Sequence, residues 1–316
     1  MNSPATVLAL VGPTAVGKTD VALALAARLP VDLISLDSVM VYRGMDIGTA
    51  KPSAEVLERF PHALLDIRDH TERYSVASFL RDADQAVGLA LQRGRLPVLV
   101  GGTMLYLRAF REGLAQLPEA DPGLRAQIQQ EAERVGWRAL HDELIKADPQ
   151  AAAGIHPNNP QRLVRALEVL RSTGRPISEF WRQQKEQQVG HRLGVNLKEV
   201  ALVPDDRRLL HERINARFAA MLEAGLIDEV IGLRARFDLS LELSSMRAVG
   251  YRQVWQFLEG DLSYESLVQT GTAATRQLAK RQLTWLRSWP QVREISWGAS
   301  AQVADRLVRD CQLEIC

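Results

Sequence analysis

Short apolar runs and amphipathic stretches alternate along the first third of the chain. Strand-type runs cover residues 6–12, 32–37, 62–67 and 96–102, and apolar residues recur at helical spacing between them. Alternation of this kind is typical of a parallel sheet covered by helices. The pattern therefore predicts an α/β fold.

The pattern changes between residues 117 and 194, where strand-type runs vanish and polar helical segments replace them. A strand-type run returns at residues 197–204, and residues 292–297 offer a last strand. We predict a catalytic domain formed by residues 1–116 and 195–316, interrupted by an all-helical insertion at residues 117–194.

Composition narrows the class of protein. The 316 residues are 46% hydrophobic and 24% charged, which suffices for a full core. No apolar run approaches the roughly 18 residues of a membrane span, and no signal segment opens the chain, so we expect a cytoplasmic protein without membrane association. Two cysteines, Cys311 and Cys316, exclude a disulfide framework or a zinc cluster. The net charge of +1 leaves a polyanionic partner open.

The first chemical motif follows the first strand-type run. Residues 12–19 fit the pattern G-x-x-x-x-G-K-[ST], in which backbone N–H groups wrap an anion. Lysine adds a positive charge, and the threonine hydroxyl can bind Mg²⁺. We predict a diphosphate site with Mg²⁺ on Thr19, built from Gly12, Pro13, Thr14, Ala15, Val16, Gly17, Lys18 and Thr19.

Further polar residues follow other strands, at the edge where open α/β sheets bind ligands. Asp37 and Ser38 end the second run, where Asp37 can hold magnesium or accept a proton. The polar, glycine-containing residues 42–52 predict a binding loop. Thr103 follows a Gly-Gly pair and offers either a ligand contact or a helix N-cap.

Two arginine pairs admit both a functional and a structural interpretation. Arg213 and Arg217 lie four residues apart on one helix face and can steady a leaving diphosphate, although Glu212 offers a salt bridge instead. Arg162 and Arg165 share a polar face with Glu168, opposite an apolar stripe. That polar face either is exposed to solvent or contacts phosphate groups.

A second basic run carries Arg276, Lys280, Arg281 and Arg287 near Trp285. A solvated helix face is the ordinary explanation for such a run. Two basic runs in a chain that also has a phosphate loop favour the interpretation that these runs bind RNA.

Five motifs give a specific resemblance. GPTAVGKT, DSVMVYRGMDIGTAKP, GGTMLYLRA, NPQRLVRALEV and MRAVGYRQVW resemble, in order, the motifs of the tRNA dimethylallyltransferase family, also called tRNA isopentenyltransferase, in its bacterial form. The resemblance covers nearly the whole chain. It implies a fold like that of small P-loop kinases. It also implies transfer of a prenyl group from dimethylallyl diphosphate to N6 of the adenosine just 3′ of the anticodon.

The resemblance also implies residue roles in a protein that we expect to be a monomer. The catalytic residues would be Asp37, as general base, with Thr19, Thr103 and Arg217, and the diphosphate would also meet Arg213. Val16 and Met40 stand where the family commonly has Ser and Gln, so Met40 offers no amide to a base. Contacts to the tRNA anticodon stem-loop are expected from Asp37, Ser38, Val39, Met40, Thr103, Arg125, Gln161, Arg162, Leu163, Val164, Arg165, Arg247, Lys280 and Arg281.

Two other functions use the same phosphate loop. A small-molecule kinase would bind ATP there, and a nucleotide-dependent RNA-binding module would bind without group transfer. An early arginine-rich lid and an N-K-x-D guanine motif are both missing from the sequence, which disfavours a kinase and a GTPase-type switch respectively.

Overall fold

The chain forms two compact units in this computed structural model, which describes residues 4–115, 117–289, 291–311 and 313. One unit combines Met1–Arg111 with Leu193–Cys316, and the other is Glu112–Arg192. No helix in the described part of the chain combines the length and apolar character that a bilayer crossing requires.

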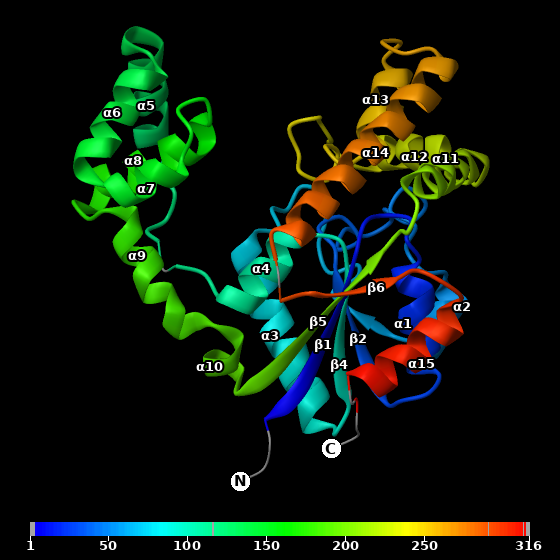
Figure 1. The fold of residues 1–316 in the computed structure, drawn as a ribbon. Helices are drawn as coiled ribbons and strands as arrows, with labels where there is room; N and C mark the ends of the chain where they lie inside the picture. Colours follow the sequence, from blue (N-terminus) through cyan, green and yellow to red (C-terminus); the bar gives the residue numbers. More distant parts are fainter. Residues whose placement is uncertain (1–3, 116, 290, 312, 314–316) are drawn as a thin grey trace. The chain divides into compact units, whose positions relative to one another are not determined.

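Six parallel strands form the centre of the first unit (Figure 1). Their order across the sheet is β3-β2-β4-β1-β5-β6, and every neighbouring pair is parallel. The predicted parallel α/β fold is therefore confirmed. The strands are β1 (Ala5–Val11), β2 (Val31–Leu36), β3 (His62–Ala63), β4 (Leu96–Gly101), β5 (Val195–Val203) and β6 (Arg293–Ser296).

Helices cover the sheet and continue beyond its edge. Those assigned mainly to the first unit are α1 (Lys18–Ala26), α2 (Ala54–Arg59), α3 (Val76–Gln92), α4 (Met104–Glu112), α11 (Arg207–Glu223), α12 (Leu226–Arg236), α13 (Tyr251–Leu258), α14 (Tyr264–Arg287) and α15 (Ser300–Asp310). The described elements of the second unit are helical: α5 (Pro122–Val135), α6 (Trp137–Ala147), α7 (Pro149–Gly154), α8 (Pro160–Thr173), α9 (Ile177–Gln183), the 3₁₀ helix η1 (Gln184–Gln187) and α10 (Val189–Leu193).

Both faces of the sheet are covered, which explains why its strands read as nearly continuous apolar runs. Leu8 and Leu10 of β1 pack in one cluster with Leu25 of α1 and Leu307 of α15. From Val7 onward, the alternate residues of β1 are also fully buried. Helices α3 and α4 lie on the opposite side of the sheet from α1 and α15 (Figure 1).

The strand predicted at residues 62–67 is mostly wrong. Only His62 and Ala63 pair with β2, because Leu64 and Asp66 adopt positive φ values of 67° and 53° and leave the extended conformation. The Asp66 carboxylate instead accepts a hydrogen bond from Lys51 at 2.6 Å. A long-range ion pair therefore replaces local strand propensity at this point.

The helical unit has its own core and its own buried charge. Leu163 and Val164 of α8 are buried in this core, at 0% and 6% exposure. The sequence pattern predicts Glu168 on the polar face of the helix, but this residue is also 0% exposed. Its carboxylate accepts hydrogen bonds from Arg125 of α5 at 3.0 Å and from Arg165 at 2.7 Å. Buried carboxylates require such partners, so Glu168 links α8 to α5.

We predict that Gly271→Ala destabilises the protein whereas Gly88→Ala does not. A Cβ on Gly271 of α14 would lie 2.1 Å from Cζ of Phe218, a ring packed in a buried cluster with Tyr251. Overpacking costs about 1–3 kcal/mol, only partly offset by about 1 kcal/mol of helix propensity. Gly88 of α3 has nothing within 4 Å of its Cβ position, so it is the matched control. Urea unfolding of both variants gives the free energies; equal stabilities would contradict the packing argument.

Candidate active site

Strands β1, β2 and β4 end at the same position across the sheet, so the loops that follow them lie at one edge. Val11 of β1 pairs with Gly101 of β4, and Leu36 of β2 pairs with the same glycine. Residues 12–17, 37–40 and 102–103 therefore leave the sheet side by side. A Cβ on Gly101 would lie 2.1 Å from the Leu36 carbonyl oxygen, so this close approach of β2 and β4 requires glycine.

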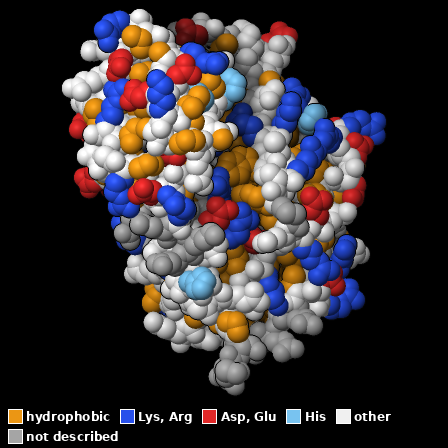
Figure 2. Space-filling model, turned by 60° about the vertical axis from the view of Figure 1, so that its left-hand side comes forward, with side chains coloured by type: hydrophobic (Ala, Val, Ile, Leu, Met, Phe, Trp, Pro, Cys, Tyr) orange, Lys and Arg blue, Asp and Glu red, His pale blue; other side chains and the backbone are white. Residues whose placement is uncertain are grey.

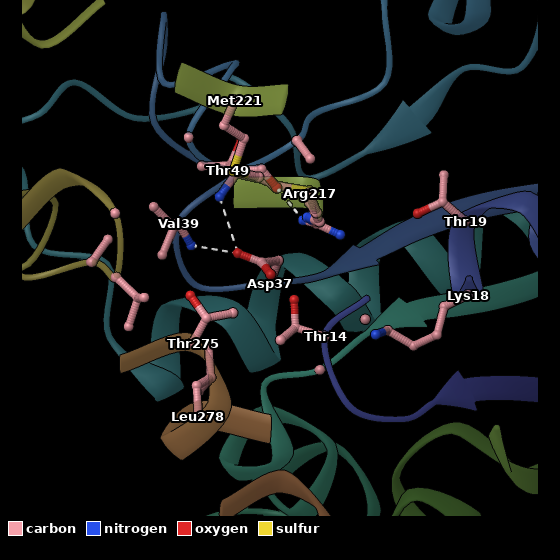
Figure 3. Close-up of a pocket in the computed structure, with 18 of the residues that line it drawn as sticks. Thr14, Lys18, Thr19, Asp37, Val39, Thr49, Arg217, Met221, Thr275 and Leu278 are labelled. Carbon is pink, nitrogen blue, oxygen red and sulfur yellow. Dashed lines mark hydrogen bonds between the residues drawn. The ribbon is translucent and has the colours of Figure 1, made fainter. Parts of the chain in front are cut away.

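A cavity of about 170 Å³ lies at this edge, within the first unit (Figure 3). Side chains from distant parts of the sequence point into it, and they divide into a polar and an apolar set. The polar set includes Thr14, Lys18, Thr19, Asp37, Arg217 and Gln282, and the apolar set includes Val39, Met40, Ile214, Phe218, Met221 and Leu278.

The predicted phosphate loop joins β1 to α1, which begins at Lys18. Gly17, at the N-cap of α1, has a φ of 92°, in the region that favours glycine. A Cβ on Gly12 would lie 2.5 Å from the Leu202 carbonyl oxygen, so glycine is also required there. The Lys18 ammonium donates a hydrogen bond to the Pro13 carbonyl at 2.8 Å and so folds over its own loop.

Lys18 and Arg217 place two cationic groups beside one carboxylate. Burial and the nearby Arg217 lower the pKa of Lys18 to about 7, while Asp37 acts in the opposite direction. Burial also lowers the pKa of Arg217, against the effects of Asp37 and Asp20. The cavity therefore carries positive charge that is poorly solvated, which favours an anionic ligand.

Asp37 lies at the carboxyl end of β2, where its Oδ1 accepts hydrogen bonds from the Val39 N–H at 2.8 Å and the Met40 N–H at 3.2 Å (Figure 3). The carboxylate is thus held by the turn that follows it. Figure 3 shows Asp37 between Arg217 and Thr275, with Thr14 beside it and Lys18 farther to the right. The structure brings the predicted acid–base and phosphate-binding groups into one cavity.

Thr103 lies at the start of α4 and bonds to the turn after Asp37. Its N–H donates to the Leu36 carbonyl at 3.2 Å, and its hydroxyl accepts from the Ser38 N–H at 3.1 Å. The hydroxyl also lies 3.5 Å from that of Ser38. Thr103 therefore fixes the backbone next to Asp37, and its expected role in catalysis stays a prediction.

The two arginines of α11 lie at different places. Arg217 lines the cavity, where its guanidinium donates to the Thr49 carbonyl at 3.3 Å. Arg213 is exposed, stacks over Trp297 at 4.8 Å and lies 3.6 Å from where a Cβ on Gly17 would be. Glu212 pairs with Arg208 at 3.9 Å, so this carboxylate has another partner on its helix.

The predicted binding loop at residues 42–52 forms one wall of the cavity and is held by residues that the sequence did not single out. Glu229 of α12 accepts hydrogen bonds from the N–H groups of Asp46, Ile47 and Gly48 at 2.7–3.2 Å, and from the Tyr251 hydroxyl. Lys51, whose side chain is 3% exposed, pairs with Asp46 and Asp66 at 2.6 Å each. A loop with this many bonds presents a fixed wall.

Gln282 of α14 was also missed. Its amide accepts a hydrogen bond from the Thr14 N–H at 2.8 Å and donates one to the Gly102 carbonyl at 2.9 Å. A signal was present, because Gln282 lies between the buried Ala279 and Leu286 at helical spacing, and a polar residue in an apolar stripe needs partners. The basic residues around Gln282 pointed instead to an RNA-binding surface on this helix.

The residues expected to contact RNA lie in both units. In the helical unit, Gln161 and Arg162 are exposed, whereas Arg125 and Arg165 pair with Glu168. The side chains of Leu163 and Val164 are buried and pack in the core of this unit, so an RNA contact of these two residues stays a prediction. In the first unit, Lys280 and Arg281 are exposed, and Arg247 pairs with Glu242. Figure 2 shows Lys and Arg interspersed with Asp and Glu on the visible face.

A metal would have to be held with few protein ligands. Within the described residues, no group of three or more His, Cys, Asp or Glu side chains could hold an ion. Thr19 lines the cavity together with Asp37, which suits Mg²⁺, since this ion often takes one or two protein oxygens plus substrate phosphates. The donor set therefore fits the predicted Mg²⁺.

Comparisons with known proteins agree with one another. A family model described as IPP transferase matches residues 40–289. The tRNA dimethylallyltransferase 2 of Hahella chejuensis is 56% identical over 297 residues, covering 91% of this chain and 89% of that protein.

Solved structures give the same result. The tRNA isopentenylpyrophosphate transferase of Bacillus halodurans has a TM-score of 0.70 and 38% identity, and the comparison covers 97% of each chain. The tRNA delta(2)-isopentenylpyrophosphate transferase of Staphylococcus epidermidis has a TM-score of 0.69 and 31% identity, over 98% of this chain and 99% of that one. The chain belongs to the IPP transferase family.

Proposed function

We propose that the protein is a transferase that moves a dimethylallyl group from dimethylallyl diphosphate to N6 of the adenosine just 3′ of the anticodon in tRNA. One observation carries this proposal: the phosphate loop and the Asp37 carboxylate face the same cavity, which apolar side chains such as Phe218 and Met221 also line. An anionic leaving group, an apolar prenyl group and a proton acceptor are the three features that such a reaction requires. Membership of the family supports the same activity.

The reaction forms one bond and breaks one. The adenine N6 attacks the allylic carbon, the carbon–oxygen bond to diphosphate breaks, and a proton leaves N6. Oδ1 of Asp37 already accepts two hydrogen bonds, so the proton would pass to Oδ2. Lys18 and Arg217 stabilise the charge that develops on the departing diphosphate.

Mg²⁺ would be held by the Thr19 hydroxyl and by substrate oxygens. When bound, the ion supplies positive charge that makes diphosphate a better leaving group. The base must leave its stack to enter the cavity, as in other enzymes that modify bases. Exposed Arg162, Lys280 and Arg281 would contact the tRNA backbone.

Incubation of the purified protein with unmodified tRNA and labelled dimethylallyl diphosphate tests the proposal. Label should enter tRNA at the adenosine 3′ to the anticodon, whereas labelled ATP in a parallel reaction should transfer nothing. Phosphate transfer from ATP without prenyl transfer would overturn the proposal in favour of a kinase.

We predict that Asp37→Asn loses turnover while it still binds both substrates. The change keeps the shape and a carbonyl acceptor for the Val39 N–H but removes the basic carboxylate, which is expected to cost about 10²- to 10⁴-fold in rate. Single-turnover prenyl transfer across a magnesium titration measures this loss. Rescue by high Mg²⁺ would reassign Asp37 to the metal, and a near-normal rate would remove it from the mechanism.

We predict that diphosphate binding takes up a proton through Lys18. The pKa of Lys18 is about 7 in the free protein, and a bound anion would raise it. Between these two values the bound state holds more protons, so affinity falls as pH rises above about 7. Calorimetry near pH 8 in buffers of different ionisation enthalpy counts the protons. Lys18→Ala should bind less tightly and take up none; equal uptake in this variant would exclude Lys18 as the source.

We predict that Arg162→Ala weakens tRNA binding and reduces the salt slope by about one, because exposed Arg162 can neutralise a phosphate. Arg165→Ala should instead lower the free energy of unfolding by about 1–3 kcal/mol, since Glu168 would lose a partner. Filter binding across a salt series, together with urea unfolding, separates the two effects. An Arg162→Ala variant that binds tRNA like the parent at every salt concentration would leave this residue as ordinary surface.

A further inference from the structure

Gln282 joins two loops of the active site that are far apart in sequence. Its side chain is buried, with 7% of the residue exposed. The oxygen of its amide accepts the Thr14 N–H at 2.8 Å, and the nitrogen donates to the Gly102 carbonyl at 2.9 Å. Thr14 and Gly102 lie 268 and 180 residues away from it in sequence. A neutral amide is one of the few side chains that can accept and donate in this way at once.

The two partners belong to the two halves of the proposed chemistry. Thr14 is part of the loop that carries Lys18 and Thr19 into the cavity. Gly102 directly precedes Thr103, whose hydroxyl accepts from the Ser38 N–H beside Asp37. Three hydrogen bonds and the peptide link between Gly102 and Thr103 thus connect the phosphate loop, through Gln282, to the turn that holds the carboxylate.

The Gln282 amide is packed directly against the backbone of Gly102. A Cβ on Gly102 would lie 2.3 Å from Nε2 of Gln282, so this glycine leaves the room that the amide occupies. The same helix presents Thr275 and Leu278 to the cavity and exposes Lys280 and Arg281. The buried side chain of Gln282 therefore ties helix α14 to both loops.

We propose that Gln282 is a positioning residue that sets the distance between the phosphate loop and the Asp37 turn, an inference that rests on the proposed prenyl transfer. The side chain needs no contact with the reacting atoms for this role. Its two hydrogen bonds fix where the leaving group and the proton acceptor stand relative to each other. Misplacement of reacting groups by about 1 Å can cost roughly 10²-fold in rate.

Gln282→Met is the direct test, because it retains volume and removes both hydrogen bonds. Gln277→Met, an exposed glutamine on the same helix, is the matched control. At saturating substrates we expect the single-turnover rate of Gln282→Met to fall about 10- to 100-fold. The dissociation constants for tRNA and dimethylallyl diphosphate should stay within about threefold, a change of less than 1 kcal/mol in binding. A rate within about twofold of the parent would overturn the proposal.

Gln282→Glu separates positioning from general packing and remains informative if the Met variant unfolds. A protonated carboxyl can accept from Thr14 and donate to Gly102 as the amide does, whereas the carboxylate cannot donate. Buried glutamates can reach pKa values of roughly 8–9, so we expect the rate of the Glu variant relative to the parent to rise as pH falls from about 9 to about 6. A ratio that does not change with pH would contradict the proposal.

Amide hydrogen exchange provides a readout that does not depend on prenyl transfer. Loss of the Gln282 bonds should speed exchange in residues 12–19 and also in residues 37–42, while Gln277→Met should change neither. Unchanged exchange in residues 37–42 would overturn the coupling between the two loops. If the parent protein transferred no prenyl group, the proposed function would fail, and exchange would still decide the role of Gln282.

Discussion

Three parallel strands end at the same position across the sheet, and the site depends on this alignment. Val11, Gly101 and Leu36 share one register across β1, β4 and β2, so three loops start from the same edge. A parallel sheet fixes this register through its ladder of backbone hydrogen bonds. A shift of one residue in any strand would move Asp37 or the phosphate loop by about 3.3 Å and turn the strand's side chains to the opposite face. The chemistry is therefore built on backbone pairing before any side chain contributes.

Two cationic side chains and one carboxylate line the cavity. Lys18 and Arg217, both largely buried, face one carboxylate, Asp37, in a space that apolar side chains also line. Like charges that share such a space repel strongly because the effective dielectric constant is low. Hydrogen bonds partly offset this repulsion: Lys18 donates to the Pro13 carbonyl, and Arg217 donates to the Thr49 carbonyl. Both cations are thus held at the cavity by neutral backbone acceptors, an arrangement that would favour a negatively charged ligand.

The sequence was informative wherever function depended on neighbouring residues. The phosphate loop, the strand before Asp37 and the helical character of residues 117–194 all follow from local patterns. Contacts made across long separations were not visible: the Lys51–Asp66 ion pair displaced a predicted strand, and Glu168 was placed on a solvent face because its partner Arg125 belongs to another helix. The role of Glu229 was not predictable for the same reason, because the three loop N–H groups that it holds lie about 180 residues away. Gln282 differs, since its place in an apolar stripe is a local signal although its partners are distant.

The position of β5 has a consequence for synthesis on the ribosome. This strand pairs with β1 from Ala5 to Val11, which is the whole of β1, yet the helical segment of Glu112–Arg192 separates it from the first four strands. At roughly 5–20 residues per second, the nascent chain would carry an open β1 edge for about 5–20 s before β5 emerges. An unpaired apolar edge can recruit other chains, so early folding of the helical segment, or a chaperone on that edge, would favour correct closure of the sheet.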